Sequence, residues 1–276
     1  MGHPQIAAFA SLADGGAKPT RSIAGQNTLI TRTIHDFAYD PARDEIVAPQ
    51  FYAQAILTYR GGANGNEAPI RIIQGPDTQI TNADKLALDP IHREIFVPLV
   101  EDFKIVVFSS DANGNVAPLR VLKGPDTLLD TKATVTPTIA VDPVHDLLVV
   151  ASKERGLLIF NRTDAGNVKP RAIISGPKSQ LTPSIFSPVK MAVYPPRALL
   201  LVGVGKGGNY YSPTGDYVGV WSLMDNGDVP PRWTIGGPNG MLHRSGAITI
   251  DPKNKSVIVA DKYVNGALTY YFPEIF

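Results

Sequence analysis

The chain has 276 residues, of which 43% are hydrophobic and 18% are charged, and its formal net charge is +1. A net charge this close to zero provides no basic surface of the kind that binds nucleic acid, so we expect no nucleic-acid partner. The chain contains no cysteine, which excludes disulfides and thiol catalysis. No apolar run approaches the roughly 20 residues that span a bilayer, so we expect no membrane span.

The amino terminus leads directly into the first β-favouring run. It has neither the basic region nor the apolar region of a signal peptide. We interpret Met1 and Gly2 as standing in place of a cleaved signal peptide. The prediction is therefore an extracytoplasmic protein, either secreted or periplasmic.

A Gly-Pro corner, or a close variant of it, recurs along the chain at intervals of about 50 residues, and the last interval is longer because of an insertion. The corner glycines are Gly25, Gly75, Gly124, Gly176 and Gly237. A fixed period of this size indicates one supersecondary unit that is repeated several times.

Each period contains four short β-favouring runs, and the second period shows them most clearly at residues 84–89, 94–99, 104–108 and 119–123. Turn residues separate the runs, with an Asp-Pro pair after the first and Asn113-Gly114-Asn115 after the third. Pairs of first and second runs recur at 37–48, 139–151, 191–202 and 248–260, which makes five pairs in all.

Four-stranded antiparallel units with this period are typical of a β-propeller. We predict an all-β chain that forms a single propeller domain over residues 1–276, with five blades. Six blades remain an alternative, because the amino terminus supplies surplus strands. The last unit lacks a fourth strand, so we expect an N-terminal strand near residues 20–24 to complete the last blade and close the ring.

The run from Ile139 to Asn161, with its Ile-Ala-Val-Asp-Pro start, resembles NHL-type and related bacterial propeller repeats. Those repeats usually carry glycine just before the Ile-Ala-Val run, and this chain departs from them there. The residues at that position are Asp36, Lys85, Thr138, Lys190 and Ala247. The resemblance implies the propeller fold but not the chemistry, because such propellers include binding proteins, hydrolases, lactonases and lyases.

Propellers gather the connections between blades, and the turns between second and third strands, on one face around the mouth of the central channel. On that face we predict a ligand site, in which His35 and His243 are the candidate catalytic acid/base pair of the enzyme alternative. The expected ligand-binding residues are Asp36, Lys85, Glu101, Lys153, Lys190, Tyr210, Tyr211, Arg244, Asp261 and Tyr263. A water-filled channel with Asp36 paired to lysine is the alternative to a ligand pocket.

The insertion at residues 204–217 carries Tyr210, Tyr211 and Tyr217. We expect it to form a tyrosine-rich lid over the same face. His92 and His145 belong to turns on the opposite face. The arginine repeated once per blade and the Asn-Gly-Asn sequences are expected to be structural, the latter as hairpin turns and not as calcium loops.

The sequence contains no Gly-x-Ser-x-Gly or His-Glu-x-x-His motif. We therefore predict a binding protein that recognises a small polar ligand or a protein partner at the channel mouth. The alternative is an enzyme of the lactonase, hydrolase or lyase type. Lactonase-like propellers hold a metal with Glu, Asn and Asp, and this chain offers Asp36, Glu101 and Asp261 without an inner Asn, so we expect no metal and no cofactor.

Overall fold

The computed structural model describes residues 4–32, 34–99, 101–129, 138–152, 154–181, 187–205, 216–237 and 239–276. The chain forms two compact units, residues 1–121 and residues 122–276. Within the described part, no helix is long and apolar enough to cross a membrane.

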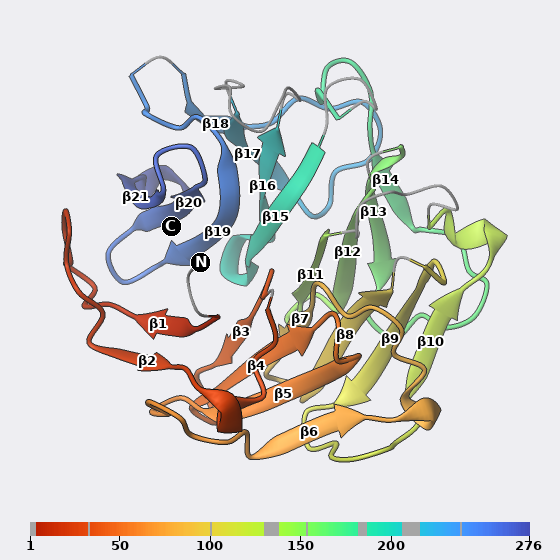
Figure 1. The fold of residues 1–276 in the computed structure, drawn as a ribbon. Coiled ribbons are helices and arrows are strands. Elements are labelled where there is room, and N and C mark those ends of the chain that lie inside the picture. The colour runs from red at the N-terminus through yellow and green to blue at the C-terminus, as the bar shows by residue number, and fades with distance from the viewer. Residues whose placement is uncertain are drawn as a thin grey trace. The chain divides into compact units, whose positions relative to one another are not determined.

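The first unit contains a two-stranded hairpin and two four-stranded sheets (Figure 1). The hairpin pairs β1 (Ile6–Ala8) with β2 (Arg21–Ile23). The first sheet runs in chain order through β3 (Ala38–Asp40), β4 (Glu45–Gln50), β5 (Ala55–Arg60) and β6 (Arg71–Gln74). The second runs through β7 (Ala87–Asp89), β8 (Glu94–Leu99), β9 (Lys104–Ser109) and β10 (Arg120–Lys123), and the unit boundary falls within β10.

The second unit contains three further sheets. The first is β11 (Thr138–Asp142), β12 (Leu147–Ser152), β13 (Gly156–Asn161) and β14 (Ala172–Ile174). The next is β15 (Ser187–Tyr194), β16 (Leu199–Gly205), β17 (Tyr217–Ser222) and β18 (Trp233–Gly236). The last has three strands, β19 (Ser245–Asp251), β20 (Ser256–Asp261) and β21 (Gly266–Tyr271).

These sheets confirm the all-β prediction and the five blades of antiparallel strands in meander order. The described part of the fifth blade holds three strands, as the missing fourth run predicts. Residues 20–24 do form a strand, β2, whose antiparallel partner is β1. Closure of the ring by this strand stays a prediction.

The Asp-Pro sequences make the turns between first and second strands. Asp142 Oδ1 accepts the backbone N–H groups of Val144 at 2.9 Å and His145 at 3.2 Å, and its Oδ2 lies 2.8 Å from His145 Nδ1. Asp89 makes the same contacts with Ile91 and His92. An aspartate that bonds to the following backbone in this way fixes the turn locally, which is why the sequence predicts it.

The third-to-fourth-strand turns make a contact that recurs between successive blades, which we call the clasp. In each clasp the turn glycine forms a parallel bridge with the outer strand of the preceding blade. The bridges are Ile23 to Gly65, Ile73 to Gly114, Leu122 to Gly166 and Ile174 to Gly227. The clasp therefore ties successive blades together along their outer edges.

The clasp also explains the repeated corner glycine. Gly124 has a φ of 136°, and a Cβ at this position would collide with the side chain of Asn167 from the next turn. The same asparagine accepts the backbone N–H of Asp126 at 2.8 Å. Only glycine can adopt this backbone conformation with a neighbour so close. The corner glycine therefore recurs once per blade because each blade contacts the next one in the same way.

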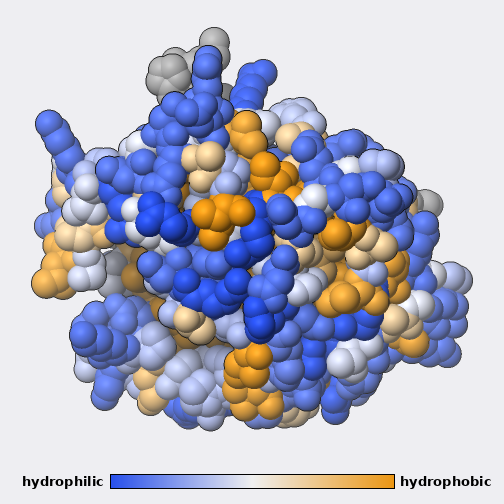
Figure 2. Space-filling view, turned by 90° about the horizontal axis from the view of Figure 1, so that it is seen from below, coloured by the Kyte–Doolittle hydropathy of each residue, from blue (hydrophilic) through white to orange (hydrophobic). Residues whose placement is uncertain are grey.

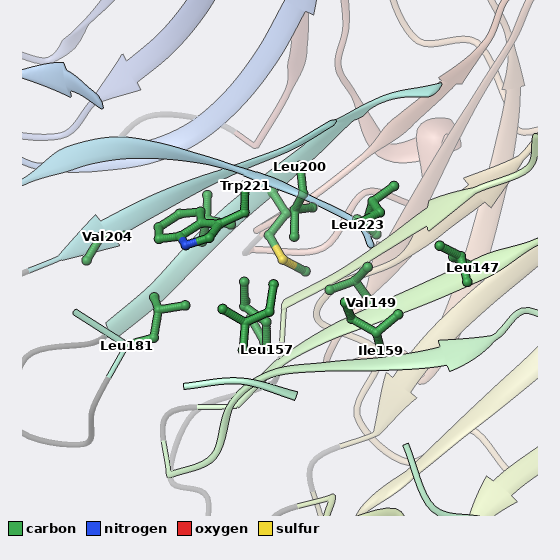
Figure 3. Packing of buried hydrophobic residues seen from close by; sticks show 14 of the residues in the cluster. Leu147, Val149, Leu157, Ile159, Leu181, Leu200, Val204, Trp221 and Leu223 are labelled. Carbon is green, nitrogen blue, oxygen red and sulfur yellow. The ribbon is translucent and has the colours of Figure 1, made fainter. Parts of the chain in front are cut away.

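Buried apolar side chains fill the space between adjacent sheets. In the second unit, one cluster joins β12 and β13 to β16 and β17, with Trp221 fully buried beside Leu200 and Val204 and opposite Leu157 (Figure 3). A second cluster joins β16–β18 to β19 and β20 and includes Ile275 from the C-terminal turn η5 (Pro273–Ile275). Successive side chains of a strand point to opposite faces of its sheet, so each sheet contributes apolar side chains to the clusters on both of its sides.

Candidate functional site

The connections between blades and the turns between second and third strands lie at the same end of each sheet. In the first blade Ala38 of β3 pairs with Val47 of β4, and Gln50 at the end of β4 pairs with Ala55 of β5. The segment that enters β3 and the β4–β5 turn therefore meet at one end, which we call the connection end. Most of the predicted site residues that the structure describes belong to these entering segments and turns, so they lie at the connection ends of their sheets.

His35, Asp84 and Lys85 form a charged cluster at the connection end of the first unit. His35 Nδ1 contacts Asp84 Oδ1, and Lys85 Nζ donates to the backbone oxygen of His35 at 3.2 Å. The exposed fraction is 51% for the His35 side chain, 12% for Asp84 and 17% for Lys85. Asp84 orients a half-exposed imidazole, and the lysine is hydrogen-bonded to the backbone of the same residue.

Asp36 stands beside this cluster but faces inward. Its Oδ1 accepts the N–H of Phe37 at 2.9 Å, and its Oδ2 accepts the N–H of Leu86 at 3.2 Å. The residue is buried. Asp36 therefore joins the start of β3 to the start of β7, and the energy of two charge-assisted hydrogen bonds supports a structural role.

The β4–β5 turn adds an aromatic pair at the same end. Tyr52 is 67% exposed and its ring meets that of Phe51 edge-on, with centroids 5.2 Å apart. Gln50 beneath the turn is fully buried, and its Oε1 accepts both the N–H and the hydroxyl of Thr31. The turn and the segment that enters β3 are thereby held against one another.

Glu101 lies in the corresponding turn of the second blade and is exposed. Its neighbour Asp102 forms an ion pair with Lys104 at 3.1 Å and accepts from the hydroxyl of Thr81 at 3.3 Å. Glu101 therefore occupies the position that Tyr52 occupies in the first blade, with charge in place of an aromatic ring.

Asp261 organises the predicted residues of the second unit. Its Oδ2 accepts the N–H groups of His243 at 2.7 Å and Arg244 at 2.8 Å, and its Oδ1 accepts those of Tyr263 and Val264. Burial by itself raises the pKa of Asp261, but these four hydrogen bonds outweigh burial and hold the pKa below its usual value. Asp261 therefore supports the local backbone.

His243 and Tyr263 lie above this carboxylate as a ring pair, with centroids 5.1 Å apart. Tyr263 is 47% exposed and occupies the same turn position as Tyr52. The structure thus brings the predicted residues together in two groups, one in each unit. The predicted pairing of His35 with His243 stays a prediction.

Lys190 lies on β15 and is partly buried. Lys153, Tyr210 and Tyr211 lie outside the described residues, and the predicted lid lies there with them. Tyr217 corrects the sequence prediction, because it begins β17 and packs in the core cluster instead of extending from the insertion. Burial raises its pKa to about 12.

The opposite end of the sheets carries His92 and His145, as predicted, each hydrogen-bonded to the aspartate of its own turn. The repeated arginines are structural, as predicted, although several of their partners are carboxylates. Arg120 forms a bidentate pair with Glu94 at 2.7 Å, and Arg71 contacts Glu45. Within the described ranges, no group of three or more His, Asp or Glu side chains is arranged to hold a metal ion.

The surface is largely hydrophilic, and Figure 2 shows apolar side chains as separate patches on one face. The exposed large apolar residues include Phe37, Tyr39 and Tyr52 in the first unit and Met241 and Tyr263 in the second. Phe37 is 51% exposed, whereas the residues at the same repeat position, Leu86, Ile139, Met191 and Ile248, are all buried.

Tyr52, Gln50 and Asp84 also lie at the connection end of the first unit but are absent from the predicted ligand-binding set. The adjacency of Asp84 to Lys85 gives no sign in the sequence that Asp84 reaches His35, 49 residues away. Gln50 gave a weak signal, because it stands in the same turn position as Asp261. Asp84 and Gln50 both act through partners that are distant in the sequence.

Comparison of the structure with solved structures shows the β-propeller fold. A chain in the "Crystal structure of Nidogen/Laminin Complex" matches with a TM-score of 0.55 and 17% identity, over 86% of this chain and 80% of that one. The Cps50 (Swd1) β-propeller domain of Myceliophteria thermophila matches with a TM-score of 0.54 and 12% identity, over 84% of this chain and 64% of that one.

A chain of a mitotic checkpoint complex matches with a TM-score of 0.59 and 11% identity, over 92% of this chain and 66% of that one. The chain therefore spans about two thirds of the length of the last two neighbours. No family model and no curated protein sequence matches the chain. The chain is thus a five-bladed β-propeller by fold, and its resemblance to NHL-type repeats rests on the sequence pattern.

Proposed function

We propose that this propeller is a binding protein that docks a protein partner at the connection end of its first unit. The observation that supports this most directly is Tyr52, a two-thirds exposed tyrosine at a turn tip, in edge contact with Phe51. Tyrosine and phenylalanine are enriched at protein interfaces, where they supply a large contact area at a small cost in conformational entropy.

Three sets of hydrogen bonds hold the turn that carries Tyr52. The side chain of Gln50 accepts the N–H of Thr31, and Gln74 Nε2 donates to the backbone oxygen of Ala53 at 2.8 Å. The strands β4 and β5, which the turn connects, pair with one another. A preorganised turn loses little entropy when a partner binds, so more of its contact energy appears as affinity.

Charged groups of both signs accompany the aromatic pair. The His35–Asp84 pair and the Asp102–Lys104 pair belong to the connection end of the same unit. Such groups provide orientation and specificity at the rim of an interface more than affinity. A protein surface with complementary charges fits this arrangement better than a small polar ligand does, because the inward carboxylate of Asp36 is already taken by backbone N–H groups.

Two of the structural neighbours come from assemblies of proteins, the nidogen/laminin complex and the mitotic checkpoint complex. They support the proposal only by analogy of fold. An extracytoplasmic location also stays a proposal, because a chain without cysteine fits the cytosol and an exported protein equally. Fractionation of the source cells would test this, and recovery only in the cytosol would refute it.

Site-specific photocrosslinking tests the docking proposal. Benzoylphenylalanine is placed at Tyr52 and, as a matched control, at Ile91, which is 60% exposed at the opposite end of the second blade. We expect one discrete crosslinked protein at position 52, with yield reduced by competing unmodified chain, and none at position 91. Equal crosslinking at both positions would contradict the proposal.

The alternative is an enzyme, and the His35–Asp84 contact is the observation that favours it, because a carboxylate that orients an imidazole is a common acid/base arrangement. A panel of lactones and esters would be tested with the wild type, His35→Ala and Asp84→Asn. Turnover that falls at least about 100-fold in His35→Ala, in a protein that stays folded, would establish the enzyme. Absence of turnover in the wild type together with crosslinking at Tyr52 would support the binding protein.

A further inference from the structure

Three of the clasps contain the dipeptide Asn-Gly, at Asn64-Gly65, Asn113-Gly114 and Asn226-Gly227. This dipeptide deamidates readily in flexible chains, because glycine leaves its own backbone nitrogen accessible. That nitrogen attacks the asparagine Cγ, ammonia leaves, and water opens the resulting succinimide to aspartate or isoaspartate. The side chains of all three asparagines are exposed, so accessibility alone predicts rapid reaction.

The clasp engages both reacting groups of each dipeptide. Asn113 Oδ1 accepts the N–H of Ile72 at 2.9 Å, and the N–H of Gly114 donates to the oxygen of the same Ile72 at 2.6 Å. A single residue of the preceding outer strand thus holds the amide oxygen of the electrophile and the proton of the nucleophile. The attacking nitrogen cannot lose that proton or reach Cγ until both hydrogen bonds open.

The other two clasps repeat this arrangement. Ser22 donates its N–H to Asn64 Oδ1 at 3.2 Å and accepts the N–H of Gly65 at 2.7 Å. Ile173 donates to Asn226 Oδ1 at 3.0 Å and accepts from Gly227 at 2.7 Å. The same hydrogen bonds recur in three blades, so the arrangement belongs to the repeat and not to one local environment.

Two further Asn-Gly dipeptides, Asn239-Gly240 and Asn265-Gly266, lie outside the clasps, and Asn265-Gly266 provides the contrast. Asn265 is exposed in the β20–β21 turn, and its side chain makes no hydrogen bond to any described residue. The following Gly266 begins β21 opposite Asp261, so the contrast with the clasps lies in the asparagine amide and not in the glycine backbone. Asn265 belongs to a turn between second and third strands, where no clasp forms. The same dipeptide therefore occurs in one chain with and without the clasp.

We propose that Asn64, Asn113 and Asn226 are latent deamidation sites, which react only when a blade separates from its neighbour. Isoaspartate adds a methylene group to the backbone and removes the aligned acceptor, so reaction in the open state prevents the clasp from reforming. Deamidation at one of these sites would therefore be an irreversible mark that the two blades joined by its clasp have separated.

Peptide mapping by mass spectrometry after incubation in mildly alkaline buffer tests this proposal. In the folded protein we expect Asn265 to deamidate and the three clasped asparagines to react at least about tenfold more slowly, because each clasp must release the asparagine amide as well as the glycine N–H. In denaturant we expect all four to react at similar rates. Clasped sites that react as fast as Asn265 in the folded protein would overturn the proposal.

A pair of variants isolates one clasp. Ser22→Pro removes the N–H that binds Asn64, and an edge strand tolerates proline where no ladder donor is lost. Ser22→Ala keeps that N–H and is the control. We expect faster deamidation at Asn64 alone in Ser22→Pro, with Asn113 as the internal reference. An unchanged rate at Asn64 would refute the mechanism, and the comparison with Asn265 remains decisive if Ser22→Pro fails to fold.

Discussion

Single residues account for the two features that the sequence repeats most strictly, the corner glycine and the turn aspartate. The aspartate acts on its own neighbours two and three positions later, so its role is visible in the sequence. The glycine acts through a side chain about 40 residues away, as Gly124 does with Asn167. Sequence periodicity shows that this glycine matters, and only the structure shows why.

Replacement of Gly124 by alanine tests that explanation. The left-handed backbone and the collision with Asn167 should together cost about 1–3 kcal/mol in the free energy of unfolding. Gly62→Ala is the control, since Gly62 lies in the β5–β6 turn with open space around it and without a positive φ. Urea denaturation of both variants measures the difference, and equal stability would remove the proposed cause.

Asp261 gives a prediction about pH. Its folded-state pKa is lowered, so its contribution to stability is complete above the unfolded pKa of about 3.9 and is lost as pH falls through the folded pKa. We expect Asp261→Asn to be destabilised by about 1–3 kcal/mol at neutral pH, because an amide group then faces backbone donors.

The deficit of Asp261→Asn should shrink below about pH 4, where the wild-type carboxylate becomes protonated as well. Asp14→Asn, which makes the same charge change at an exposed position, should show no such dependence. Melting curves across this range measure both. A deficit that is independent of pH would mean that the ionised carboxylate is not what the four N–H groups stabilise.

At the scale of elements, local patterns were sufficient for the strands. The predicted run 104–108 is β9 (Lys104–Ser109), and the predicted start at 139 is β11 (Thr138–Asp142). Strand alternation and turn residues are local, and they determine such boundaries within a residue or two.

The site could be predicted only in part, because its partners come from distant segments. The sequence placed His35 and Lys85 at the connection end but gave Asp36 and Asp261 a ligand role, whereas backbone N–H groups of other segments occupy both carboxylates. It also assigned Tyr217 to a loop, since the register at the end of an insertion has no repeat to guide it.

The C-terminal turn is another element that the sequence did not reveal. Ile275 is fully buried, Phe276 meets the ring of Tyr194 at 5.0 Å, and Arg197 donates to the backbone oxygen of Glu274 at 2.6 Å. We expect Ile275→Ala to lower the free energy of unfolding by about 2–5 kcal/mol. Leu12→Ala, at a 90% exposed residue, should change it by less than about 0.5 kcal/mol.

At the scale of the whole molecule, ring closure remains to be tested. The strand β2 contacts Gly65 through the same parallel bridge that the outer strands β6, β10 and β14 make with the turn of the following blade. It thus serves as the outer strand that precedes the first blade. Deletion of residues 1–25 should therefore lower the melting temperature far more than loss of a frayed terminus would. An unchanged melting temperature would refute closure.

The proposal that the connection end is a docking surface is tested most directly by affinity, once crosslinking has identified the partner. Calorimetric titration would compare Tyr52→Ala with Ile91→Ala, two exposed residues at opposite ends of neighbouring blades. We predict at least a tenfold loss of affinity for Tyr52→Ala, about 1.4 kcal/mol or more as for an interface hot spot, and less than a twofold change for Ile91→Ala. A larger loss for Ile91→Ala, with both variants folded, would contradict the proposed site.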